Sequence, residues 1–178
     1  MNFTEDWFSH NIPNFETCMS AIPDKKLFLE IGSYEGRSTC WLLENGLADK
    51  GSIVCVDPYS AGGFDKIEAR FWSNTAQARK DTQVVFLMKK TSYEAIAEMI
   101  GYKYAFDFIY VDGSHAPDVA LTDACMAWGL LKQGGVMLFD DYLYPHEPTK
   151  LGVDAFLDGF KSHYDIILNN YQLAVQKK

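Results

Sequence analysis

The sequence predicts an α/β fold: a doubly wound, mostly parallel sheet with helices on both faces. Five short apolar runs alternate with segments of helical composition, a pattern that favours parallel strands joined by crossover helices. Two further apolar runs joined by Asn169-Asn170 indicate a closing hairpin, whose inner strand must run antiparallel to its neighbour. With 178 residues and no repeat or linker, the chain is expected to be one domain, residues 1–178.

Residues 1–24 are expected to form an N-terminal helical segment ahead of an α/β core that spans residues 25–178. The helical spacing is carried by four apolar side chains: Phe8, Ile12, Phe15 and Met19. A helix packed on the edge of the sheet is the simpler interpretation, and a lid over a ligand is the alternative. Trp7 and His10 are close enough to this helix to reach a nearby active site.

The first strand and the turn after it are the most informative stretch of the chain. Leu27–Ile31 is an apolar run that predicts a buried strand, and Arg37–Leu43 predicts the helix that follows. Gly32 and Gly36 lie between them. Glycines let the backbone approach a bound molecule, and the free N–H groups of a helix start favour polar or anionic atoms. The stretch lacks Gly-x-Gly-x-x-Gly, so it is not the dinucleotide fingerprint.

The rest of the chain continues the alternation. Four more buried strands are expected at Ser52–Asp57, Gln83–Met88, Phe106–Asp112 and Val136–Phe139. Helices are expected at Asp65–Lys80, Ser92–Ile100, Pro117–Lys132 and Lys150–Phe160, and the hairpin strands at Tyr164–Leu168 and Tyr171–Val175. Ser92 is the expected N-cap of its helix, and Gln133–Gly135 is expected to end the helix that starts at Pro117.

Carboxylates occupy the ends of four of the expected strands. They are Glu30, Asp57, Asp112, and the pair Asp140 and Asp141. One acid after a strand is often only a helix cap or a turn residue. In an open parallel sheet, however, ligands bind at the carboxyl ends of the strands, near the point where the strand order reverses. The four positions together therefore predict a ligand site along one edge of the sheet.

Composition excludes several classes of function. The formal charge of −8 disfavours nucleic-acid partners, because phosphate contacts need clustered Lys and Arg. None of the four cysteines forms a C-x-x-C pair, so buried thiols in a reducing cytosol are expected. No signal peptide and no apolar run of about 18 residues is visible, so neither secretion nor a membrane span is expected.

Four segments of the sequence are more informative in combination than any one of them is alone. They are Glu30-Ile-Gly-Ser-Tyr-Glu-Gly-Arg-Ser38, Val56-Asp57, Asp107-Phe-Ile-Tyr-Val-Asp-Gly-Ser-His115, and Leu131-Lys-Gln-Gly-Gly-Val-Met-Leu-Phe-Asp-Asp-Tyr142. Together they resemble the class I S-adenosylmethionine-dependent methyltransferases, and most of all the small branch of macrocin-type sugar O-methyltransferases. The resemblance implies a Rossmann-like sheet of seven strands, with S-adenosylmethionine as cofactor and a small-molecule hydroxyl as methyl acceptor.

The resemblance also implies roles for the residues that bind the cofactor. Glu30 and the turn that contains Gly32, Ser33 and Gly36 hold its amino-acid end, with Ser38 near the carboxylate. Asp57 accepts hydrogen bonds from the two ribose hydroxyls, since a carboxylate offers two oxygens. Ser92 or Tyr93 lies beside the adenine. Asp112 either lies under the methionine portion or binds a metal.

Asp112, Asp140 and Asp141 resemble the metal-binding acids of magnesium-dependent O-methyltransferases. A divalent cation such as Mg²⁺ relieves the repulsion among three carboxylates and lowers the pKa of a substrate hydroxyl. In the alternative without a metal, Asp140 and Asp141 are loop acids bonded to backbone amides. His115 is the candidate general base, because an imidazole accepts a proton near neutral pH; it is also a candidate metal ligand or substrate-positioning group. Some antibiotic-sugar relatives carry Asp-Gly-Asp where this chain has Asp112-Gly-Ser114.

Two other classes of function remain as alternatives at this point. A nicotinamide-dependent oxidoreductase uses a similar sheet, but the missing glycine fingerprint and Glu30 count against it. A non-catalytic module that binds an adenosyl cofactor is disfavoured by the acids and His115. The acceptor is expected between the N-terminal segment and the loops Pro58–Phe64 and Tyr142–Thr149, and a homodimer is one way to complete this pocket.

Overall fold

The structure, a computed structural model, describes residues 1–60, 64–101, 105–146 and 148–178. Within this part of the chain, seven strands form one sheet. They are β1 (Leu27–Ile31), β2 (Ser52–Val56), β3 (Val84–Met88), β4 (Phe106–Val111), β5 (Leu131–Phe139), β6 (Tyr164–Asn169) and β7 (Leu173–Lys177). Their order across the sheet is β3-β2-β1-β4-β5-β7-β6. The predicted α/β fold, with a mostly parallel sheet and a closing antiparallel hairpin, is confirmed.

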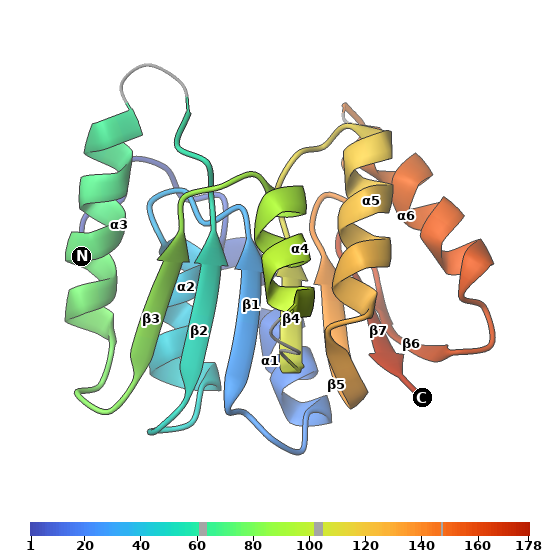
Figure 1. Cartoon of the computed structure of the whole chain (residues 1–178), viewed down its shortest axis with the longest axis horizontal. Coiled ribbons are helices and arrows are strands. Elements are labelled where there is room, and N and C mark those ends of the chain that lie inside the picture. The colour runs from blue at the N-terminus through green and yellow to red at the C-terminus, as the bar shows by residue number, and fades with distance from the viewer. Residues whose placement is uncertain (61–63, 102–104, 147) are drawn as a thin grey trace.

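Strands β1 to β5 run parallel, so their carboxyl ends all meet at the upper edge in Figure 1. Strand β7 is inserted between β5 and β6 and runs antiparallel to both. From β1 the chain first builds outward through β2 and β3, and then returns to place β4 on the other side of β1. This reversal between β1 and β4 is the point where an open α/β sheet binds its ligands.

Helices cover both faces of the sheet (Figure 1). Their bounds are α1 (Ile12–Ala21), α2 (Arg37–Trp41), α3 (Phe64–Ala78), α4 (Ser92–Gly101), α5 (Pro117–Trp128) and α6 (Thr149–Gly159). Side chains of α1, α2 and α3 share one apolar core with one face, and those of α4, α5 and α6 share a second core with the other face. No helix in the described part of the chain is both long and apolar enough to cross a membrane.

Helix α1 packs on a face of the sheet and reaches from the edge strand β6 toward the centre, so the expectation of packing at the edge is met only in part. Phe15 is fully buried, and its ring lies 4.9 Å from that of Tyr110 and 6.0 Å from that of Phe108, centroid to centroid. Both partners belong to the central strand β4. Large aromatic side chains gain most from complete removal from water, which the middle of a sheet provides and its edge does not. This position brings the residues before α1 to the ligand edge.

Two predicted helix boundaries are corrected. Thr91, not Ser92, precedes α4 as its cap: its carbonyl accepts the Ala95 N–H at 3.1 Å, and its own N–H and hydroxyl donate to Glu94. Helix α5 ends at Trp128, and Leu131 already begins β5, so residues 133–135 lie in the strand. The chain must enter the sheet early because Phe106 N–H bonds to Leu130 O at 2.8 Å.

The turn after α2 also differs from a plain helix end. The predicted helix over 37–43 is a short α-helix that widens into a π turn at Leu42–Gly46.

All four cysteines are free thiols; Cys18, Cys40 and Cys55 are buried, whereas Cys125 is exposed. The expectation of buried thiols therefore holds for three of the four.

Candidate functional site

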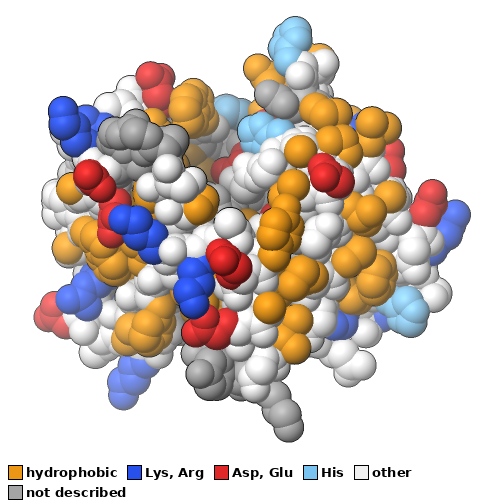
Figure 2. Space-filling view, turned by 45° about the horizontal axis from the view of Figure 1, so that its top comes forward, with side chains coloured by type: hydrophobic (Ala, Val, Ile, Leu, Met, Phe, Trp, Pro, Cys, Tyr) orange, Lys and Arg blue, Asp and Glu red, His pale blue; other side chains and the backbone are white. Residues whose placement is uncertain are grey.

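A cavity of about 850 Å³ lies at the carboxyl edge of the parallel strands. Figure 2 shows a hollow at this edge, in the upper part of the view, with acidic and histidine side chains around it. Nine of the residues predicted for the site line the cavity: Gly32, Ser33, Ser38, Asp57, Ser92, Asp112, His115, Asp140 and Asp141. Its volume is in the upper part of the range of about 300–1,000 Å³ that is typical of small-molecule sites.

The turn after β1 requires glycine at its first position. Gly32 has φ +86°, a conformation that side chains rarely adopt, and an added Cβ would lie 1.8 Å from the carbonyl oxygen of Asp112. Its N–H donates to Val56 O at 2.8 Å, which ties the turn to the end of β2. Gly36, with φ +77°, does not line the cavity but lets the chain turn into α2. At Gly32, main-chain atoms rather than a side chain therefore line the cavity.

Asp57 organises the same turn from the end of β2. One of its carboxylate oxygens accepts the Tyr34 N–H at 2.9 Å, and the other accepts the Tyr59 N–H at 3.0 Å. The Tyr59 hydroxyl in turn donates to the Tyr34 carbonyl at 2.6 Å. Each carboxylate oxygen has two lone pairs, so both can accept a second hydrogen bond from a ligand in the cavity. A pair of neighbouring hydroxyls fits this acceptor set.

Glu30 lies beneath the turn rather than in the cavity wall. It is fully buried and accepts hydrogen bonds from the hydroxyls of Ser38 and Thr39. Burial raises the pKa of Glu30 to about 6, against the opposing effect of these hydrogen bonds. The predicted direct contact with the amino-acid end of a cofactor is therefore not supported by its position. Its acceptor oxygens instead fix the start of α2, and Thr39 is a partner that the sequence analysis missed.

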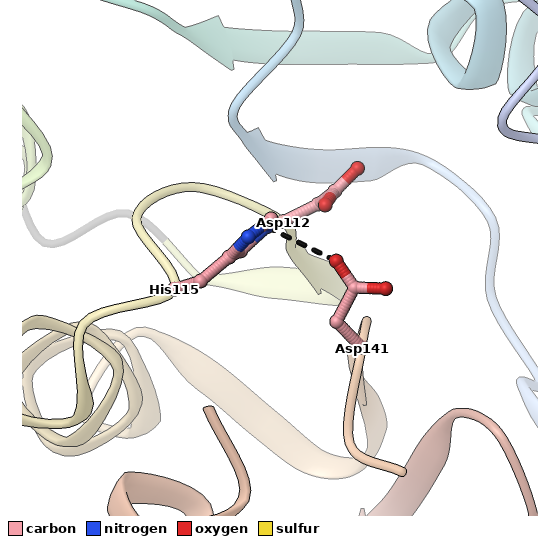
Figure 3. Close-up of side chains that lie close together, drawn as sticks. All are labelled: Asp112, His115 and Asp141. Carbon is pink, nitrogen blue, oxygen red and sulfur yellow. Dashed lines mark ion pairs between the residues drawn. The ribbon is translucent and has the colours of Figure 1, made fainter. Parts of the chain in front are cut away.

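Asp112, His115 and Asp141 meet just after the ends of β4 and β5, and all three line the same cavity (Figure 3). One potential metal-ligand atom from each lies within 4.8 Å of the others, and His115 Nε2 lies 3.1 Å from an Asp141 oxygen. The other Asp141 oxygen accepts the Tyr171 hydroxyl. Tyr171 was missed by the sequence analysis, because only the pairing of β7 with β5 brings the hairpin turn to this site.

Asp140 does not join this group, so the predicted metal set Asp112, Asp140 and Asp141 is corrected. Its carboxylate is buried and accepts the Tyr110 hydroxyl at 2.7 Å, Gln172 Nε2 at 2.8 Å and Asn11 Nδ2 at 3.4 Å. A carboxylate with three side-chain donors is satisfied without a cation. The backbone N–H of Asp141 also donates to this carboxylate, so its donors combine side chains with a backbone amide of the kind that the alternative without a metal expected.

Burial and neighbouring acids raise the pKa values of Asp112 and Asp140. Burial, followed by the charges of Asp140 and Asp141, raises the pKa of Asp112 well above its usual range. Burial also raises the pKa of Asp140, and the charge of Asp141 adds to this effect. A positive charge bound between these carboxylates would reverse the shift. The site is thus suited to a cation or to a cationic ligand group.

Residues 1–10 form a strap over the cavity, which we call the N-terminal strap. The Thr4 N–H and hydroxyl donate to Glu35 at 2.7 and 2.9 Å, and Arg70 donates to the same carboxylate at 2.5 Å. Although burial opposes it, these hydrogen bonds lower the pKa of Glu35. Trp7 and His10 line the cavity, as the sequence analysis expected for an active site within their reach.

The two loops predicted to carry acceptor specificity are described only in part. Residues 61–63 of the first loop and residue 147 of the second lie outside the described residues. Of the second loop, Tyr144 lines the cavity. Its ring centroid lies 6.4 Å from that of Tyr171, so the loop and the hairpin form one aromatic wall.

The strand order and the ligand edge define the Rossmann-like methyltransferase fold. The chain also matches the family model described as "Methyltransferase domain" over residues 29–142, and it belongs to this family. The class I methyltransferase resemblance of the sequence is confirmed. The match begins within β1 and ends just after Asp141, so it contains the glycine turn and all four strand ends that carry acids.

Among curated proteins, the chain is 26% identical over 121 residues to the uncharacterized protein R132 of Acanthamoeba polyphaga mimivirus, covering 67% of this chain. It spans 52%, about half, of that protein's length.

Among solved structures, the fold is similar to that of an O-methyltransferase from Bacillus cereus in complex with SAH (S-adenosylhomocysteine). The TM-score is 0.71 at 19% identity, over 97% of this chain and 82% of the other. It is also similar to a putative rRNA-methylase from Clostridium thermocellum, with a TM-score of 0.69 at 15% identity, over 93% of this chain and 96% of the other.

Proposed function

We propose that this chain transfers a methyl group from S-adenosylmethionine to a hydroxyl oxygen of a small molecule. One observation carries the proposal: the glycine turn with Asp57 and the His115–Asp141 pair line the same cavity. Family membership supports methyl transfer, and the SAH bound to the Bacillus cereus neighbour supports the identity of the donor.

The donor side of the cavity fits S-adenosylmethionine by its chemistry. Bound there, this cofactor supplies an electrophilic methyl group on a sulfonium. Asp57 would accept hydrogen bonds from the ribose hydroxyls with the lone pairs that Tyr34 and Tyr59 leave available. Ser33 and Ser38 in the cavity wall, together with the backbone beside Gly32, would hold the amino-acid end. Ser92 and Tyr93 line the part of the cavity that follows β3, where the adenine is expected.

The acceptor side fits the deprotonation of a hydroxyl. Asp141 holds His115 through Nε2 and is itself oriented by the Tyr171 hydroxyl. We assign His115 as the group that takes the hydroxyl proton, while the Asp141 carboxylate stabilises the imidazolium that forms. With the donor bound, the deprotonated oxygen would be placed to take the methyl group, and S-adenosylhomocysteine would be the leaving group. Since the displacement is in line, positioning both partners in one cavity provides much of the catalysis.

A divalent cation is a second way to activate the acceptor at this site. Asp112, His115 and Asp141 offer oxygen and nitrogen ligands close enough to hold one ion. Such an ion would lower the pKa of an acceptor hydroxyl. In that case His115 is a ligand rather than a base, and activity depends on the metal.

Calorimetric titration tests the donor assignment. We expect S-adenosylmethionine and S-adenosylhomocysteine to bind and NADH not to bind. Binding of NADH alone would contradict the proposal in favour of an oxidoreductase. Adenosyl binding without methylation of any compound in a broad hydroxylated panel would favour the non-catalytic binding module.

Chelation separates the two modes of activation. In excess chelator, an enzyme that uses His115 as a base keeps full activity, whereas a metal-assisted enzyme loses it and regains it with added Mg²⁺. Asp141→Ala is expected to abolish activity in both cases and to leave S-adenosylhomocysteine affinity nearly unchanged. A large loss of that affinity would place Asp141 on the donor side instead.

A further inference from the structure

We propose that the acceptor is a small ring compound that is uncharged or cationic, and that the cavity rejects anionic acceptors. This inference rests on the proposed methyl transfer and adds the substrate class. It combines two features of the cavity: an excess of carboxylates in its wall and a set of aromatic rings in the same wall, of which Tyr171 contacts the His115–Asp141 pair.

The first feature is charge. Seven carboxylates line the cavity: Glu5, Asp6, Glu35, Asp57, Asp112, Asp140 and Asp141. Among the described lining residues, Arg37 is the one Lys or Arg side chain. A cleft lined by charges of one sign concentrates its field on whatever enters. This cavity therefore attracts cations and repels anions.

The cationic side chains near the cavity are already engaged. Arg37 donates to Asp6 at 3.3 Å and to Ser9 at 2.8 Å, and Arg70 is paired with the buried Glu35. A phosphate or carboxylate on the acceptor would have to compete with Asp6 for Arg37 or with Glu35 for Arg70. Polyanions need several such partners along their length. Arg37, whose Nε–H has no hydrogen-bond partner, is the one guanidinium that the described wall offers, so phosphorylated acceptors and nucleic acids are disfavoured.

The second feature is the ring lining. The Trp7 ring lies 5.4 Å from that of Tyr34, and His10 lies 5.5 Å from Tyr171, centroid to centroid. Tyr144 adds a further face beside Tyr171. Trp7 is 65% exposed although it lines the cavity, so its indole has apolar surface left to cover. Flat apolar faces of this kind bind the faces of rings, and they bind cations through their π electrons.

The two features meet where the chemistry is proposed. The Tyr171 hydroxyl donates to Asp141, which holds His115, so the aromatic wall continues into the proposed proton acceptor. A ring that lies against this wall presents a ring hydroxyl to His115. A phenol and a sugar share the required chemistry, which is a hydroxyl on a flat-faced ring without negative charge.

Two matched charge series test the proposal. The phenolic series is 3,4-dihydroxybenzylamine, 3,4-dihydroxybenzyl alcohol and 3,4-dihydroxybenzoate; the sugar series is glucosamine, glucose and glucuronate. Each compound is titrated into the protein saturated with S-adenosylhomocysteine, and kcat/KM with S-adenosylmethionine is measured for those that bind. In the series that binds, we expect the amine and the uncharged member to exceed the anion by about tenfold or more, in low salt.

The outcomes are distinct. Equal or better binding of the anionic member in the series that binds overturns the charge selection, and absence of binding in both series overturns the ring acceptor. Failure of S-adenosylhomocysteine to bind refutes the proposed function itself. Binding in the expected order without methylation supports the acceptor class and counts against the proposed catalysis.

Matched variants locate the selectivity. Glu5→Gln removes one lining carboxylate outside the proposed catalytic pair and should narrow the preference over the anion about two- to threefold. Glu16→Gln makes the same charge change on the exposed side of α1, outside the cavity, and should leave the preference unchanged. Equal effects of the two variants would trace the preference to the overall charge and overturn the assignment to the cavity. Trp7→Ala should raise KM for the ring acceptor about two- to tenfold with little change in kcat.

Discussion

The donor side and the acceptor side of the cavity are built in opposite ways. The donor side is a turn of five consecutive residues, 32–36, fixed by backbone conformation and by hydrogen bonds to Asp57. The acceptor side is gathered from the N-terminal strap, the ends of β4 and β5 and the hairpin turn, and it is held by side chains. Backbone groups can hold a methyl donor that many enzymes share. The side chains of the proposed acceptor wall, by contrast, can be substituted without disturbing the sheet.

The largest effect is expected at Gly32, where the donor side depends on backbone alone. In Gly32→Ala, the new Cβ would overlap the Asp112 carbonyl at 1.8 Å, and the backbone would have to leave its positive φ. We expect S-adenosylhomocysteine binding to be lost and stability to fall by about 3 kcal/mol, measured by calorimetry and denaturant unfolding.

Gly159→Ala is the matched control, because nothing lies within 4 Å of the Cβ added at the end of α6. It should keep affinity and stability close to those of the parent chain. Normal binding by Gly32→Ala would show that the donor side tolerates a shift of its backbone.

His115→Gln should lower the rate of methyl transfer without changing donor affinity. Loss of a general base lowers kcat by about 10²–10⁴-fold, while the donor side, which His115 does not hold, should bind S-adenosylhomocysteine as before. Steady-state kinetics and calorimetry on one preparation measure both. His163→Gln, on the exposed surface, is the control. A parallel loss of donor affinity would mean that the two sides are not independent.

Glu35→Gln should loosen the strap, with a smaller effect. Glu35 is only 2% exposed and receives the Thr4 N–H, the Thr4 hydroxyl and Arg70. Loss of its charge should weaken this contact by about 1–3 kcal/mol and raise the acceptor KM more than the donor Kd. Because the Thr4 hydroxyl binds the same carboxylate, Thr4→Val should add less in the Glu35→Gln background than alone. Simple additivity would argue against a shared contact.

The smallest effect concerns pH. The pKa of Glu30 is raised by burial to about 6, so between pH 4.5 and 6 the folded chain binds more protons than the unfolded chain. The contribution of Glu30 to stability is therefore present at low pH and is lost as pH rises through about 6, a change of about 2 kcal/mol. Glu30→Gln should flatten this part of the stability–pH curve in urea titrations. An unchanged slope would mean that Glu30 stays ionised in the fold.

The sequence predicted the glycine turn and the acids at the strand ends because these signals are local. A strand, two glycines and a helix start follow one another in the chain, and each acid lies in or just after an apolar run. Glu30 shows the limit of such signals: alternation along β1 decides which way its side chain points, and here it points beneath the turn to Ser38 and Thr39.

The acceptor side depends on contacts between distant segments, which local patterns do not encode. Asp140 and Asp141 are neighbours in sequence, yet one binds Tyr110 and Gln172 while the other meets His115. The positive φ of Asp141, +51°, separates their directions. Likewise, α1 lies on the sheet face because Phe15 fits between aromatic rings of β4, a match that helical spacing alone does not reveal.

The missing side chain of Gly32 has one more consequence. Its Cα rests directly against the backbone of Asp112, which lies three residues before His115. The Asp112 N–H also donates to Ile31 O at 2.9 Å. The turn that would carry the methyl donor and the loop that carries the proton acceptor are therefore joined with no compressible layer between them. A displacement of one displaces the other, so the alignment of donor and acceptor is preserved when the surrounding loops and the strap move.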